Sequence, residues 1–195
     1  MGAWALFLAA NALGASDEHV VFRPPASKGA ELPYALMVLI PGAGVATSYY
    51  EAPLRAIQEA VNLRLWAVSP AIPGEKCIVY CESALICAPL HALVSSALEA
   101  AAELGWEASA MSATFLTGHS LGAVCAATLA EAYEGEYDAA VVMGACVTDV
   151  ASFPLPVLTL GAELDGGGAR PGYLSLSLRS SDAAATAAGH TVDSA

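Results

Sequence analysis

Residues 113–130, which read ATFLTGHSLGAVCAATLA, decide the fold. An apolar run at 113–117 leads directly into Gly118-His119-Ser120-Leu121-Gly122, and a helical stripe follows. The pattern Gly-x-Ser-x-Gly alone is weak, because about one chain in eight of this composition contains it by chance. Its position between an apolar run and an amphipathic helix is more specific, since a sharp strand–turn–helix exposes the serine hydroxyl. We therefore predict a strand, a tight turn carrying Ser120, and a helix.

The residue types around Ser120 agree with such a turn. Side chains at Gly118 and Gly122 would strike the neighbouring strand and helix, and the alanines after them allow the helix to pack closely on a sheet. The first amides of the helix place positive potential beside a reacting carbonyl. The alternative interpretation is a structural turn with a buried serine.

Short apolar runs recur along the rest of the chain, at residues 35–40, 63–68, 113–117, 139–143 and 157–160. Such runs are typical of strands covered on both faces, as in a parallel sheet. Helical stripes lie between them at 50–61, with Pro53 near the helix start, at 90–104 and at 121–132. This alternation predicts an α/β fold, a three-layer α/β/α sandwich with a mostly parallel central sheet. Residues 19–23 and 173–178 are candidate further strands.

A second glycine-rich turn, Pro41-Gly42-Ala43-Gly44, follows the apolar run at 35–40. In open α/β sheets ligands bind at the carboxyl ends of strands. One amide from this turn and the amide of Leu121 can together hold a developing oxyanion. A phosphate cradle is a poorer interpretation, because the turn has neither the Gly-Lys-Ser/Thr of a P-loop nor a full dinucleotide fingerprint. The long irregular segment 69–89 is a candidate wall of the same site.

Three motifs, in their order along the chain, resemble those of the α/β-hydrolase superfamily. They are Ile-Pro-Gly-Ala-Gly, Gly-His-Ser-Leu-Gly-Ala and Val-Leu-Thr-Leu-Gly-Ala-Glu-Leu-Asp-Gly. They are most similar to its small, lidless esterase-, lipase- and dienelactone-hydrolase-like members, and the resemblance covers about residues 35 to 166. It implies a serine hydrolase that forms an acyl-enzyme intermediate on an ester or related acyl substrate and needs no cofactor.

The resemblance also implies roles for individual residues. Ser120 matches the nucleophile, Leu121 and Ala43 match the oxyanion donors with Gly44 as an alternate, and the elbow comprises Gly118, His119 and Gly122. Asp165 matches the acid, with Glu163 as a second candidate.

Only His190 follows Asp165, so the family order of serine, acid and histidine makes it the expected base. The other interpretation places His190 in a tail without a role, which would make the chain a shortened relative. His19, His91 and His119 are weaker candidates for the base.

Residues 1–16 have the layout of a secretory signal peptide, an apolar stretch followed by small residues, although without Lys or Arg. We therefore expect one domain over residues 17–195, poorly defined over 167–195, and secretion or residence in the secretory-pathway lumen. Five cysteines fit export, since disulfides persist there. One bridge is expected among Cys77, Cys81 and Cys87, Cys125 is expected as a small core residue, and the partner of Cys146 is open. Their spacing does not favour zinc.

The charge balance limits which classes of partner the protein can bind. The 195 residues include 7 basic and 19 acidic side chains, giving a formal charge of −12, and polyphosphate would be repelled. We therefore expect no nucleic-acid partner, and no apolar run is long enough for a stable membrane span. Two other function classes remain open. One is a non-catalytic or truncated α/β-hydrolase-like binding protein without a working histidine, and the other is an incomplete product with an exposed sheet edge.

Overall fold

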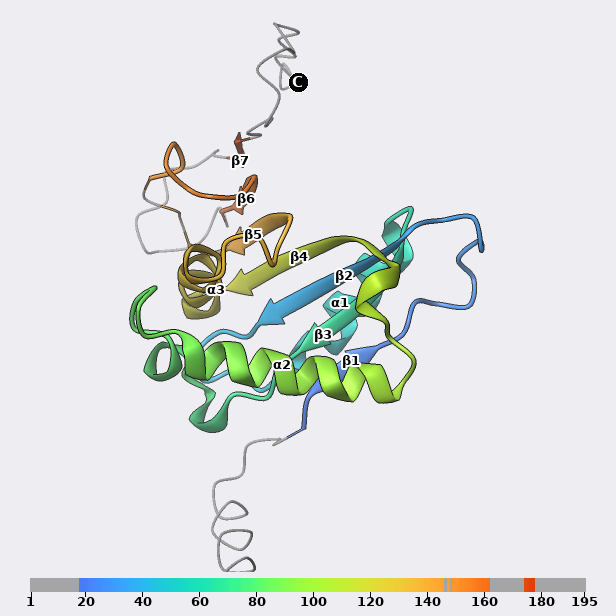
Figure 1. The fold of residues 1–195 in the computed structure, drawn as a ribbon, viewed down its shortest axis with the longest axis horizontal. Coiled ribbons are helices and arrows are strands. Elements are labelled where there is room, and N and C mark those ends of the chain that lie inside the picture. The colour runs from blue at the N-terminus through green and yellow to red at the C-terminus, as the bar shows by residue number, and fades with distance from the viewer. Residues whose placement is uncertain (1–17, 146, 148, 162–173, 178–195) are drawn as a thin grey trace, which may run out of the picture.

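The computed structural model describes residues 18–145, 147, 149–161 and 174–177 (Figure 1). Several of the expectations above fall outside the described residues: the signal peptide over 1–16, Cys146, Glu163, Asp165, His190 and most of 167–195.

A mixed, mostly parallel sheet forms the centre of the structure (Figure 1). Its seven strands lie in the order β1-β3-β2-β4-β5-β6-β7. Neighbouring strands from β3 to β6 run parallel, whereas the edge strands β1 and β7 are antiparallel to β3 and β6. The α/β class, the mostly parallel sheet and both additional strands are therefore confirmed. The bounds are β1 Val20–Phe22, β2 Tyr34–Ile40, β3 Arg64–Ser69, β4 Met111–His119, β5 Ala139–Met143, β6 Val157–Leu160 and β7 Leu174–Ser177.

Among the described residues, three α-helices connect the strands: α1 Glu51–Ala60, α2 Ala88–Glu103 and α3 Leu121–Ala132. All three coincide with predicted stripes. Helix α1 begins at Glu51, which places Pro53 in the first helical turn, where proline is tolerated. A 3-10 turn at Thr47–Tyr50 precedes the helix. The described part of the chain has three further short 3-10 turns, at Pro73–Glu75, Cys77–Tyr80 and Ala108–Ala110.

The two faces of the sheet pack against different helices. In β2, Leu36, Val38 and Ile40 belong to a buried cluster with α2 and α3. The alternate residues Ala35, Met37 and Leu39 belong to a second cluster with Leu54 of α1. This alternation follows from the two-residue repeat of a strand, and it explains why β2 is apolar on both faces. Figure 1 shows α2 and α3 on one side of the sheet and α1 behind it.

The chain reverses its direction across the sheet next to β2. After β2 it adds β3 on one side, and then crosses back to place β4 on the other side, where β5 and β6 follow. The carboxyl ends of β2 and β4 therefore flank a topological switch point. Open α/β sheets bind their ligands in the crevice at such a point.

Two disulfides hold the segment between β3 and α2, joining Cys77 to Cys125 and Cys81 to Cys87. The expected bridge within the Cys77, Cys81 and Cys87 group is thus present. Cys125 is buried on α3, as expected, but its interpretation as an unbonded core residue was wrong. The buried face of α3 lies against the segment between β3 and α2 as well as against the sheet. The sulfur of Cys125 therefore meets that of Cys77. Within the described part of the chain, no helix is long and apolar enough to cross a membrane.

Gln58 joins α1 to the edge of the sheet. Its side chain is 1% exposed, and Nε2 donates to the carbonyl oxygens of Phe22, Arg23 and Leu65 at 3.3, 3.1 and 2.7 Å. We expect Gln58→Leu to lower the free energy of unfolding by about 1–3 kcal/mol, because buried carbonyls lose their donor. Urea denaturation measures this, with Glu59→Gln on the exposed side of α1 as the control. Equal midpoints for Gln58→Leu and wild type would contradict the expectation.

Candidate active site

The candidate site lies where β2, β4 and β5 end. Ile40 is in register with Gly118, and His119 is in register with Met143. The Ser120 amide continues this ladder by donating to the Met143 carbonyl at 2.7 Å. The turn at 118–122 is therefore fixed to β5 on one side and lies beside the end of β2 on the other.

Ser120 has an unusual backbone conformation. Its φ of 53° and ψ of −123° make it one of two described non-glycine residues with positive φ, and such conformations cost about 1–3 kcal/mol. It occupies the N-cap position of α3, where serine normally accepts a hydrogen bond from the helix. Here the side chain makes no capping bond, and the residue is exposed. The expected strand–turn–helix is present, and the hydroxyl of Ser120 is not occupied by helix capping.

The strain at Ser120 is measurable. We expect Ser120→Gly to be more stable than Ser120→Ala by about 1 kcal/mol, because glycine accepts positive φ and alanine does not. Chemical denaturation of both variants measures the difference, and their common lack of a hydroxyl makes each the control of the other. An alanine variant as stable as the glycine variant would show that the turn stores no strain.

The two glycines of the turn lie against backbone. A Cβ at Gly118 would meet the carbonyl group of Gly122 and lie 2.6 Å from Ala123 Cα. A Cβ at Gly122 would meet the carbonyl oxygens of Ile40 and Pro41 and lie 2.8 Å from the Pro41 carbonyl carbon. One glycine thus lets α3 approach β4, and the other lets α3 approach the end of β2. The sequence-based reason for glycine at both positions agrees with these contacts.

Three amides of the neighbouring turn at 41–45 are already bonded. Gly42 donates to the Tyr50 hydroxyl at 2.9 Å, Gly44 to the Glu75 carbonyl at 2.9 Å, and Val45 to the Gly42 carbonyl at 3.2 Å. Among the described residues, nothing accepts from the amide of exposed Ala43 or from that of Leu121, the first residue of α3. Two unoccupied donors therefore remain in the turns next to Ser120. The Gly44 amide, the alternate donor, is engaged by Glu75.

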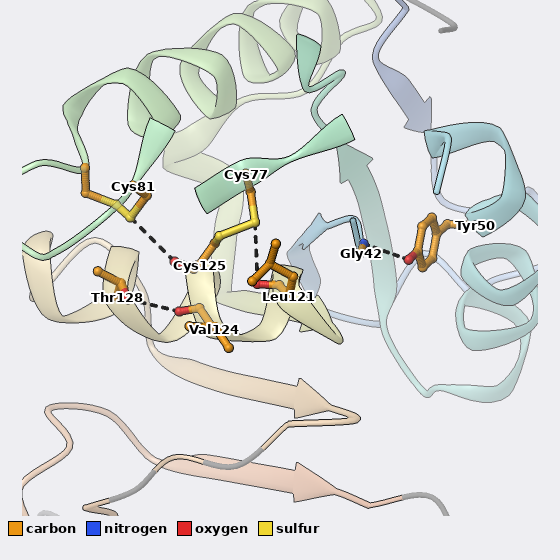
Figure 2. The surroundings of a disulfide bond; sticks show 9 residues. Gly42, Tyr50, Cys77, Cys81, Leu121, Val124, Cys125 and Thr128 are labelled. Carbon is orange, nitrogen blue, oxygen red and sulfur yellow. Dashed lines mark hydrogen bonds between the residues drawn. A yellow bond between two sulfur atoms is a disulfide. The ribbon is translucent and has the colours of Figure 1, made fainter. Parts of the chain in front are cut away.

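The segment 73–87, here called the cystine loop, contacts both turns. Glu75 accepts the Gly44 amide, and Cys77 Sγ lies 3.4 Å from the Leu121 carbonyl oxygen while bonded to Cys125 (Figure 2). The cystine loop thus contacts the turn at 41–45, here called the Ala43 turn, at one point and the start of α3 at another. The segment that we expected to be a wall of the site therefore lies against both turns.

Tyr50 connects the two turns directly. Its hydroxyl accepts the Gly42 amide and lies 2.9 Å from His119 Nδ1, and the two rings are arranged edge-on (Figure 2 shows the bond to Gly42). Burial raises the pKa of the Tyr50 hydroxyl, although the hydrogen bond from Gly42 opposes this in part. Sequence reasoning placed Tyr50 only on the buried stripe of a helix. Tyr50 is the last residue before α1. The signal in the sequence was a tyrosine, with a hydroxyl that needs hydrogen-bond partners, at a buried position where an aliphatic residue would suffice for packing.

The other two described histidines have partners elsewhere in the structure. The ring of His19 accepts from the Ala71 amide through Nδ1, and burial lowers its pKa. His91 Nε2 lies 2.8 Å from a Glu136 carboxylate oxygen, and its ring stacks on Tyr133. The predicted base His190 and acid Asp165 lie outside the described residues. Within the described ranges, no group of three or more His, Cys, Asp or Glu side chains could hold a metal ion.

Comparison with known proteins does not add a family to this picture. No protein-family model matches the chain, and a search of curated proteins finds no match.

Proposed function

We propose that this protein is a serine hydrolase that cleaves a carboxylic ester or a related acyl substrate through an acyl-enzyme intermediate. The observation that carries the proposal is the state of Ser120. Ser120 is exposed and has a positive φ, and its hydroxyl is not used for capping. The amides of Ala43 and Leu121, for which no acceptor occurs among the described residues, lie in the adjoining turns. A structural turn has no need for a strained serine, since glycine adopts the same conformation at lower cost.

The position in the fold supports the same reaction. Ser120 follows β4 and Ala43 follows β2, so nucleophile and oxyanion donor flank the switch point of the sheet. Helices on both faces support the finer architecture that we propose, the three-layer α/β/α sandwich of the α/β-hydrolases. The two disulfides are of a kind that persists in oxidising compartments, which supports a secreted or secretory-lumen location.

In the first half-reaction, Ser120 Oγ attacks the carbonyl carbon of the substrate while His190 takes the hydroxyl proton. The carbonyl oxygen becomes an oxyanion that accepts from the Ala43 and Leu121 amides, with the N-terminal dipole of α3 beside it. The carbon–oxygen bond to the alcohol then breaks. His190 returns its proton to the departing alcohol, and Asp165 holds the imidazole ring in place.

In the second half-reaction, water attacks the acyl carbon of the ester on Ser120 and gives its proton to His190. The tetrahedral intermediate uses the same two amides. Its collapse breaks the bond to Ser120 Oγ, which recovers a proton from His190, and the carboxylic acid leaves. No cofactor takes part in this scheme.

A fluorophosphonate probe tests the proposal on the full chain. We expect stoichiometric labelling of Ser120, located by peptide mass spectrometry, and slower labelling in His190→Ala, because the serine needs a base to accept its proton. Ser96→Ala is a matched control, since Ser96 lies on α2 and should leave labelling unchanged.

The competing function makes a different prediction. A non-catalytic binding protein would bind an ester saturably, without labelling and without a burst of acylation. A folded wild-type protein that shows this behaviour overturns the hydrolase proposal.

A further inference from the structure

We propose that Tyr50 is a positioning residue for the reaction, holding the Ala43 turn against the Ser120 turn through Gly42 and His119. The inference rests on the proposed function, and it assigns a role to a residue outside the set of nucleophile, base, acid and oxyanion donors. Its basis is one buried hydroxyl bonded to both turns, at 2.9 Å to the Gly42 amide nitrogen and 2.9 Å to His119 Nδ1.

The direction of both hydrogen bonds follows from the number of protons. The Gly42 amide can only donate, so the Tyr50 oxygen accepts from it. The single hydroxyl proton then needs an acceptor, and His119 Nδ1 is the one within reach among the described residues. A buried hydroxyl without an acceptor costs about 1–3 kcal/mol. We therefore assign the Tyr50 hydroxyl as the donor to His119 Nδ1, with the ring proton on Nε2.

The contact leaves little freedom to the Ala43 turn. A Cβ at Gly42 would lie 3.0 Å from His119 Nδ1 and 3.2 Å from the Tyr50 hydroxyl oxygen, so the turn, the phenol and the imidazole are in close contact. Gly42 is held on one side of Ala43, and Gly44 is held on the other by Glu75. The peptide between these two points presents the Ala43 amide. Fixing both neighbours fixes the direction of that donor.

Catalysis depends on this direction because an oxyanion donor acts only when it is already aimed at the developing charge. A displacement of about 1 Å at a reacting group can cost on the order of 10²-fold in rate. The aromatic ring of Tyr50 is buried with α1 and would pack equally well as phenylalanine. The hydroxyl is therefore the part of the side chain that acts on the site.

Tyr50→Phe removes the hydroxyl and keeps the ring. For hydrolysis of a soluble ester we expect kcat to fall by about 10- to 100-fold, with KM changed less than about twofold, because the loss affects the transition state more than substrate binding. Tyr49→Phe is the matched control, since the neighbouring Tyr49 is 77% exposed and should leave both constants unchanged.

A second readout does not depend on activity. In the wild type, ring ¹⁵N shifts should show His119 Nδ1 as a hydrogen-bond acceptor and Nε2 as protonated, and Tyr50→Phe should move the Nδ1 resonance. A purely structural role for Tyr50 would lower the free energy of unfolding and move the Nδ1 resonance while leaving the kcat of the folded enzyme unchanged. That result overturns the inference.

If Tyr50→Phe does not fold, variants of His119 carry the test from the other side. Asparagine can place an acceptor near the position of Nδ1, whereas leucine cannot. We expect His119→Leu to lose about tenfold in kcat and His119→Asn to lose less. Equal kcat values for both variants and the wild type overturn the inference.

The two proposals fail in different ways. A labelled wild type whose Tyr50→Phe variant reacts with the fluorophosphonate at the same rate overturns the role of Tyr50 alone. A folded wild type that shows the expected His119 shifts but no labelling overturns the proposed function, and the catalytic role of Tyr50 is then lost with it.

Discussion

Ser120→Ala is expected to lower kcat/KM for ester hydrolysis by on the order of 10⁴-fold or more, with no loss of fold. The attacking atom is removed, while the backbone bond from the residue 120 amide to Met143 remains available. Initial rates on a soluble ester, corrected for the uncatalysed reaction, measure the change. Near-ultraviolet circular dichroism verifies that the variant is folded.

A cysteine at the same position gives a sharper comparison. Ser120→Cys keeps a nucleophile in the same turn, so it should retain acylation by activated esters that Ser120→Ala loses, because thiolates are intrinsically good nucleophiles. If Ser120→Ala hydrolyses esters at the wild-type rate, the chemistry occurs at another residue, and the proposal for Ser120 is wrong.

Removing the Cys77–Cys125 disulfide is expected to have the largest effect on stability. The bond joins residues 48 apart in sequence, and the chain-entropy relation gives about 4 kcal/mol for a loop of this length. We expect the double variant Cys77→Ala/Cys125→Ala to lose about this much free energy of unfolding. Guanidinium denaturation without reductant measures the loss.

The second disulfide provides the control. Cys81 and Cys87 are 6 apart, for which the same relation gives about 2 kcal/mol. Cys81→Ala/Cys87→Ala should therefore lose about half as much, since all four cysteines are buried to a similar extent. The reverse order of the two losses would mean that contacts within the native loop, rather than loop closure, determine its stability.

The core of the fold could be predicted because its signal is local. Strands β5 and β6 occur at the predicted bounds, since each is a short apolar run flanked by turn residues. Strand β4 extends beyond the predicted 113–117, from Met111 to His119. The added residues are Met111, exposed Ser112, Gly118 and His119. Met111 pairs with β2, and Gly118 and His119 pair with β5, so neighbouring strands rather than a continuous apolar run extend β4.

The pairing of Cys77 with Cys125 could not be predicted, because it depends on the position of a loop relative to a helix 48 residues away. Cys125 occupies a stripe position, and that alone predicts burial but not a partner. Tyr50 was missed for a similar reason. Its helical spacing explains the burial of the ring, whereas the partners of its hydroxyl, Gly42 and His119, come from turns that only the sheet register brings together.

If the hydrolase proposal holds, the placement of the cystine loop has a consequence for how preference for substrates can diverge. Leu85 and Ile86, at 97% and 56% exposure, lie between Cys81 and Cys87, away from Glu75 and Cys77, which contact the two turns. Side chains can be exchanged or residues inserted at this tip without displacing those two contacts. Under the hydrolase proposal, selection or protein engineering can therefore remodel this exposed tip and leave the proposed reaction chemistry intact.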